Sequence, residues 1–149
     1  MGGRRIAREL ALQALYKLDM QGEAAAGDKL GLFWEQFVPE GMERGGESER
    51  FARDLVTGVE THRARIDELV AAAAEHWRLP RLSRVDLNVL RLATFELLER
   101  PEIPAAVAIN EAIEIARRYG SEDSAAFVNG VLDHIAGVLG VRSREGRPE

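Results

Sequence analysis

Three arginines and a tyrosine near the amino terminus are the residues whose types and spacing could do chemistry. They are Arg4, Arg5, Arg8 and Tyr16. Guanidinium groups neutralise phosphates, and a phenol ring offers a surface on which an unpaired base can stack. On a helix, Arg5 and Tyr16 would lie about 20° apart at about 100° per residue. The pattern can form a surface for single-stranded RNA, but from the residues alone a solvated helix face with a half-packed tyrosine is the favoured explanation.

A second basic cluster surrounds the Pro80 turn and contains Arg78, Arg81, Arg84 and Arg91. These side chains could contact RNA or a protein partner. From the residues alone, a charged surface loop is the better explanation.

The sequence contains no signature of catalysis or of metal binding. The three histidines, His62, His76 and His134, lack the spacing of a zinc site such as H-E-x-x-H. Neither a G-x-S-x-G elbow nor a G-x-x-x-x-G-K-[ST] phosphate loop is present. We therefore expect a protein that is not an enzyme and that needs no metal or cofactor.

Composition places the chain among helical cytoplasmic proteins. Its 149 residues fit one domain, and a hydrophobic fraction of 46% is enough to build a core. The absence of cysteine suits a reducing cytosol, and no apolar run reaches the roughly 18 residues of a membrane span. The net charge is −5, so an RNA site must be a local basic patch on an acidic protein.

Apolar spacing and capping residues predict six or seven helices in a compact all-α bundle. The first helix covers about residues 4–20, and a short second one carries the apolar cluster of residues 30–37. Ser48 can cap a third helix, and we expect a break between Gly58 and Arg63 before the fourth. Thr61 is the expected cap of that fourth helix, which ends near Trp77.

Helix boundaries are marked more clearly in the carboxyl-terminal half of the sequence. Residues 83–86 form a capping box, and the helix that follows, to about Glu99, is apolar nearly all round and therefore central. Pro104 suits the start of the next helix, and Gly120 its end. The last helix ends at Gly140, so residues 1–140 form the predicted domain and residues 141–149 a disordered tail.

Three segments together resemble the NusB family of transcription antitermination proteins. Residues 4–16 read R-R-I-A-R-E-L-A-L-Q-A-L-Y, and residues 82–93 read L-S-R-V-D-L-N-V-L-R-L-A. The most specific signal is A-I-N-E-A-I-E at residues 108–114, followed by F-V-N-G-V-L-D at residues 127–133. The resemblance extends over nearly the whole chain, except the glycine-rich loop near Pro39 and the tail.

The resemblance implies a fold of two small helical bundles and a function without catalysis. NusB proteins bind boxA RNA, notably in ribosomal RNA leaders, as a heterodimer with the ribosomal protein NusE. RNA polymerase and other Nus factors are indirect partners. The family's RNA-binding residues map onto Arg4, Arg5, Arg8, Tyr16, Asp123, Ser124 and Phe127. Its NusE-binding surface maps onto Leu82, Asp86 and Arg91.

Two departures from the family pattern remove positive charge, which makes binding more dependent on the partner. Ile6 interrupts the arginine run, and Ala125 and Ala126 stand where some relatives carry basic residues. The helical spacing of Phe127 and Val131 also allows Phe127 to be a core residue that meets no base.

The sequence leaves two rival functions to consider. A NusB-like module also occurs in ribosomal RNA methyltransferases, but 149 residues leave no space for their cofactor-binding domain. A structural protein that self-associates is the second rival, since some family members form homodimers.

Overall fold

The computed structural model describes residues 3–21, 31–37, 39, 41–76 and 82–146, and these contain helices and connecting turns but no strand. This confirms the predicted all-α class. No helix in the described ranges is long and apolar enough to cross a membrane. The helices are α1 (Gly3–Gln21), α2 (Gly31–Gln36), α3 (Glu47–Thr61), α4 (Arg63–His76), α5 (Arg84–Glu99), α6 (Ala105–Tyr119) and α7 (Ser124–Leu139).

The chain divides into two compact units. Unit 1 covers Met1–Thr57 and unit 2 covers Gly58–Glu149, so α3 contributes its first part to unit 1 and its end to unit 2. The site residues expected from the sequence are divided accordingly, with Arg4, Arg5, Arg8 and Tyr16 in unit 1 and the remaining ones in unit 2.

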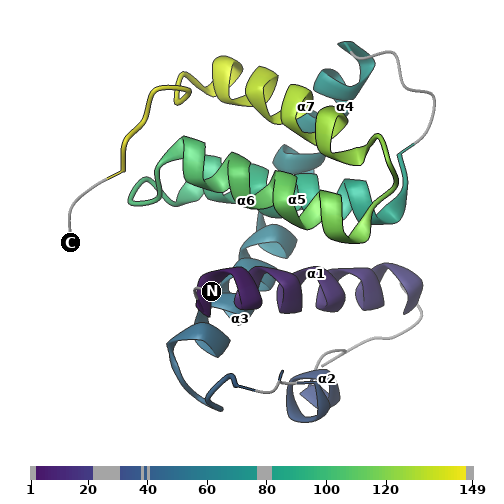
Figure 1. Cartoon of the computed structure of the whole chain (residues 1–149), viewed down its shortest axis with the longest axis vertical. Coiled ribbons are helices and arrows are strands. Elements are labelled where there is room, and N and C mark those ends of the chain that lie inside the picture. Colours follow the sequence, from purple (N-terminus) through teal and green to yellow (C-terminus); the bar gives the residue numbers. More distant parts are fainter. Residues whose placement is uncertain (1–2, 22–30, 38, 40, 77–81, 147–149) are drawn as a thin grey trace. The chain divides into compact units, whose positions relative to one another are not determined.

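Unit 1 is built on one face of α1. Figure 1 shows α1, in purple, beside the blue α3. The buried positions of α1 recur at the spacing of an amphipathic helix, as the sequence predicts. The buried apolar residues of the unit are Ala7, Leu10, Ala11, Leu12, Ala14 and Leu15 of α1, Phe33 and Trp34 of α2, and Phe51, Ala52, Leu55 and Val56 of α3.

Unit 2 is organised around α5, which contacts α4, α6 and α7 (Figure 1). Every residue of α5 from Asn88 to Leu97 is buried, so the prediction of a central helix is confirmed. Ser83 is the amino-terminal cap, and its Oγ accepts a hydrogen bond of 3.0 Å from the Asp86 backbone N–H, as the capping box predicts.

The break expected between Gly58 and Arg63 lies within that range and is a single residue. Gly58 is inside α3, which continues to Thr61, and only His62 separates it from α4. A Cβ atom at Gly58 would lie 2.1 Å from Cζ of Phe95. Glycine is therefore present at this position because a ring packs against the backbone, and not because the helix ends there.

The segment after α7 packs against the rest of unit 2 as far as Gly146. The sequence predicts a disordered tail from Val141. Gly140 has a φ of 71°, the left-handed conformation expected of a glycine that ends a helix. The Arg144 guanidinium then donates hydrogen bonds to the carbonyls of Leu97, Ile103 and Glu96 at 2.8, 3.0 and 3.1 Å. The first and last of these carbonyls lie in the final turn of α5, where several helix carbonyls lack backbone partners, although that of Glu96 also accepts a hydrogen bond of 3.1 Å from the Arg100 N–H.

Burial lowers the pKa of the Arg144 guanidinium, while the nearby carboxylates of Glu102 and Glu96 act to raise it. The group remains protonated at neutral pH, because an arginine side chain titrates far above it. It therefore supplies a positive charge at the carboxyl-terminal end of α5, where the helix dipole favours one.

We predict that Arg144→Ala lowers the free energy of unfolding by about 1–3 kcal/mol, because three carbonyls lose a charged donor. Urea denaturation measures this change. Arg142→Ala is the matched control, since Arg142 makes an exposed pair with Asp133 at 3.0 Å and should contribute less than about 1 kcal/mol. Equal effects of the two substitutions would show that the Arg144 contacts do not stabilise the fold.

Candidate nucleic-acid interface

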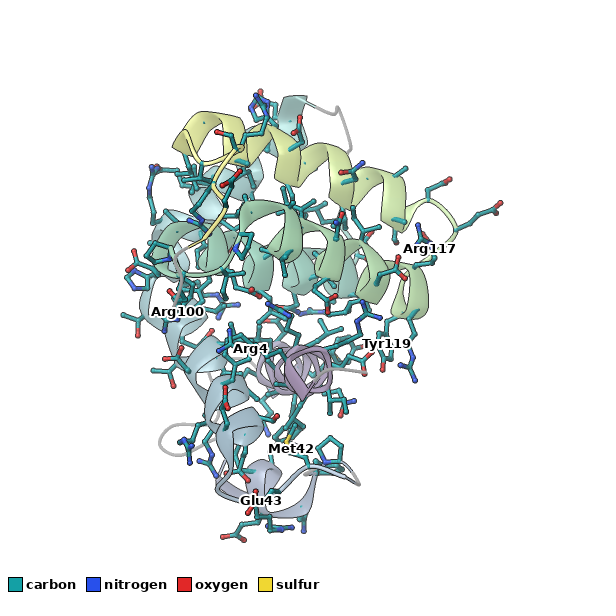
Figure 2. All side chains as sticks on the ribbon, turned by 60° about the vertical axis from the view of Figure 1, so that its left-hand side comes forward. Arg4, Met42, Glu43, Arg100, Arg117 and Tyr119 are labelled. Atoms are coloured by element: carbon teal, nitrogen blue, oxygen red, sulfur yellow. The ribbon has the colours of Figure 1, made fainter. Side chains whose placement is uncertain are left out.

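The first turn of α1 presents Arg4 beside α3. The Arg4 side chain is 45% exposed, and its guanidinium carbon lies 4.3 Å from the centre of the Phe51 ring. Its Nη2 lies 3.7 Å from Oε1 of Glu47, which is a long and solvent-exposed ion pair. Figure 2 shows Arg4 where α1 meets α3. This guanidinium is open to solvent and to an incoming phosphate.

Arg8 does not lie on the exposed stripe that the sequence predicts. The residue is only 4% exposed, and its guanidinium carbon lies 5.4 Å from the centre of the same Phe51 ring. Arg8 follows Arg4 by one helical turn, so it lies on the side of α1 that Phe51 covers. Because Arg8 is buried, an Arg8→Ala substitution would disturb packing as well as charge. Arg5, by contrast, is half-buried.

Tyr16 is the exposed aromatic side chain of α1. It is 41% exposed, whereas Leu12, which the helical wheel places within about 40° of it, is buried. The phenol thus stands at the border between the buried face of α1 and solvent. Met20, one turn later, is also exposed. An amphipathic ring with one open face suits stacking on a base.

The turn between α6 and α7 divides its three predicted site residues between surface and interior. Asp123 precedes α7 and is exposed. Ser124 is buried, and its Oγ accepts a hydrogen bond of 2.9 Å from the Ser121 backbone N–H. Phe127 is 7% exposed and lies in the core, as its spacing from Val131 allows. The Phe127 ring has no open face in this structure, because it lies one turn into the buried stripe of α7.

The structure exposes a different aromatic residue near this turn. Tyr119, the last residue of α6, is 38% exposed, and the guanidinium carbon of Arg118 lies 5.4 Å from the centre of its ring. Figure 2 shows Tyr119 and Arg117 at the same end of α6. Tyr119 is not among the site residues expected from the sequence. The signal was its place in the last helical turn directly before the capping Gly120, where side chains tend to remain outside the core.

A shallow groove of about 610 Å³ runs between α6 and α7. Its polar lining includes the carboxamides of Asn110 and Asn129 and the side chain of Arg117, which pairs with Glu114. Ala125 and Ala126 form part of its wall, and these are the positions where basic residues were expected from some relatives. The groove is consequently a neutral to acidic surface and a poor one for phosphate.

The segment expected to bind a protein partner contains an unsatisfied carboxylate. Leu82 is half-buried, whereas Asp86 is buried. Among the described residues, no hydrogen-bond donor reaches Oδ1 of Asp86. A buried polar atom without a partner costs free energy unless some other group satisfies it. This oxygen is itself buried, so a donor from a partner could reach it only if the side chains that cover it moved.

Arg91, the third residue expected in that surface, is instead an internal link between α4 and α5. Its Nε and Nη2 donate to the two carboxylate oxygens of Asp67 at 2.8 and 3.0 Å, and Nη1 donates to Oδ1 of Asn88 at 3.2 Å. The Arg91 side chain is buried, while that of Asp67 is partly exposed. The guanidinium is committed to these partners, so it positions helices in this structure.

Within the described part of the chain, no cluster of three or more histidine and acidic side chains could hold a metal ion. The chemistry these surfaces offer is ionic contact, hydrogen bonding and stacking.

Comparisons with known proteins agree with this architecture. The family model described as "NusB family" matches residues 5–137. The transcription antitermination protein NusB of Myxococcus xanthus is 49% identical over 139 residues, which cover 93% of this chain and 98% of that protein. A crystal form of T. maritima NusB is 39% identical, with a TM-score of 0.76 over 97% of this chain and 93% of that one.

A further solved structure contains the antitermination factors NusB and NusE in complex with double-stranded RNA. Its matching chain is 26% identical to this one, and the match covers 91% of this chain and 97% of that one with a TM-score of 0.74. The family match and the curated relative extend over most of the sequence, and that relative is a transcription antitermination protein. This chain belongs to the NusB family of transcription antitermination proteins.

Proposed function

We propose that this chain binds boxA-type single-stranded RNA together with NusE and thereby promotes transcription of ribosomal RNA operons. The observation that carries the proposal is the open ring of Tyr16 on the same helix as the arginine-rich start. The related NusB–NusE structure with RNA supports both partners. RNA polymerase and the other Nus factors would be reached indirectly, and transcription places the protein in the cytoplasm.

In this proposal the arginines and the tyrosine of α1 have different roles. Arg4 and Arg5 contact phosphates, which gives affinity that falls with salt but little sequence preference. Tyr16 stacks on an unpaired base and leaves the base edges free for hydrogen bonds. Arg8 is buried, so it would support the helix that presents the other two arginines.

The α6–α7 turn would contribute through Asp123, whose carboxylate can accept hydrogen bonds from base amino groups. Ser124 and Phe127 would keep this turn in place, because the first closes it by hydrogen bonds and the second anchors it in the core. Their effect on RNA binding would therefore be indirect.

A net charge of −5 opposes RNA binding by the chain alone. Each additional phosphate contact supplied by a partner raises affinity, so we expect tighter binding in the NusE complex than by the chain by itself.

The main alternative is a scaffold that forms homodimers and does not bind RNA. Light scattering distinguishes the two. RNA binding by the monomer or by the NusE complex supports our proposal, whereas a stable dimer that ignores RNA supports the scaffold.

We predict that Tyr16→Ala weakens binding of a boxA-type single-stranded oligonucleotide by about 1–3 kcal/mol, the range for loss of one base–aromatic stack. Fluorescence anisotropy on the complex with NusE measures the dissociation constant. The salt dependence should change little, because a neutral side chain is removed.

Met20→Ala is the control for Tyr16→Ala, since it removes exposed apolar surface from α1 without removing a ring. Double-stranded RNA of the same sequence is the competitor, because the related complex contains a duplex. Equal losses for both variants, or tighter binding of the duplex, would contradict stacking of an unpaired base on Tyr16.

We further predict that Asp86→Asn weakens binding of NusE about tenfold, since the change replaces a charge-assisted hydrogen bond by a neutral one. Isothermal titration calorimetry measures this affinity. Glu68→Gln makes the same change of charge at an exposed position of α4 and should have no effect. Undiminished NusE affinity in Asp86→Asn would remove this carboxylate from the partner surface.

A further inference from the structure

The arginines at the start of α1 lie at the end of the helix that is least favourable for positive charge. The first turn of α1 contains Arg4 and Arg5 and no acidic residue. The amino-terminal end of a helix carries a partial positive charge, which repels cations and favours anions. Neighbouring groups outside α1 can offset this unfavourable placement.

The first two turns of α3 supply the compensation. A Cβ atom at Gly3 would lie 2.4 Å from Oγ of Ser48, so the starts of the two helices approach closely. From there, Glu47 reaches Arg4 at 3.7 Å, and the Phe51 ring lies 4.3 Å below the Arg4 guanidinium carbon. Both contacts act on the same exposed guanidinium.

The ring contact orients the guanidinium without consuming its donors. A cation over the face of an aromatic ring is attracted by the electrons of that face, while the N–H groups of arginine point along its own plane. Phe51 is buried and therefore fixed in place. An arginine held on a fixed ring loses less conformational freedom when it binds a phosphate.

The contact between Arg4 and the Glu47 carboxylate has the opposite effect on RNA binding, because it lowers the affinity of Arg4 for a phosphate. The Glu47 side chain is largely exposed, and an exposed ion pair of this length contributes little to stability. A phosphate that approached Arg4 would compete with this carboxylate for the same donors. Glu47 thus occupies the arginine weakly and repels an incoming anion.

We propose that Phe51 and Glu47 are positioning residues for RNA binding, Phe51 by presenting Arg4 to a phosphate and Glu47 by limiting the affinity of that contact. This inference rests on the proposed RNA-binding function. In this proposal α3, which carries none of the RNA-binding residues expected from the sequence, determines how strongly the start of α1 binds.

The test is a pair of double-mutant cycles, read as the dissociation constant of a boxA-type single-stranded oligonucleotide in the presence of NusE. Phe51→Leu should weaken binding about two- to fivefold, the range of an exposed cation–π contact. The loss should be smaller in the Arg4→Ala background, where only the more distant Arg8 remains over the ring.

Glu47→Gln should strengthen binding about two- to fivefold, as expected when an exposed ion pair that competes with RNA is removed. The gain should disappear in the Arg4→Ala background. Glu35→Gln on α2 is the matched control for the change of net charge and should give a smaller gain. A residue with a merely structural role would not strengthen binding when it is replaced.

Thermal unfolding of each variant shows whether Phe51→Leu has damaged the core, and the Glu47 cycle involves only exposed side chains. RNA binding with no coupling in either cycle would overturn this inference and leave the proposed function intact. Failure of the unmodified chain with NusE to bind the oligonucleotide would overturn the proposed function and this inference together.

Discussion

Positive charge at the amino-terminal end of α1 is the constraint on which the functional interpretation depends. A helix favours acidic residues in its first turn, and α3 follows this rule with Glu47 and Glu49, whereas α1 does not. Residues placed against the helix dipole reduce stability unless neighbours compensate. The Phe51 ring provides such compensation and leaves the donors of Arg4 available, which is consistent with a surface built for phosphate.

Burial has different consequences for the functional residues of the two units. In unit 1 the buried face of α1 includes Leu12 and Leu15 and leaves Tyr16 at its edge, so an aromatic ring remains open on the helix that begins with the arginines. In unit 2 the central α5 is buried along most of its length, and its polar residues must find partners inside the protein. Arg91 finds Asp67, whereas one carboxylate oxygen of Asp86 has no donor among the described residues.

Much of the fold was predictable because helix ends and amphipathic faces are local properties. Ser83 and Gly140 mark helix boundaries through their own hydrogen bonding and backbone conformation, and α5 is recognisable because apolar residues surround it. Tyr16 could be placed at the surface from its position on the α1 wheel. The family could be identified because its motifs are contiguous stretches of sequence.

What the sequence by itself determined is therefore the set of helices, the face each one buries and the family to which the chain belongs. Only the tertiary structure decided that Arg8, Arg91, Ser124 and Phe127 are buried and that Tyr119 is exposed. Helical periodicity describes one helix at a time, whereas the environment of a residue at the edge of a buried face depends on a distant segment. Phe51 lies beside Arg8, and Asp67 binds Arg91 across 24 residues of sequence, and neither contact follows from local spacing.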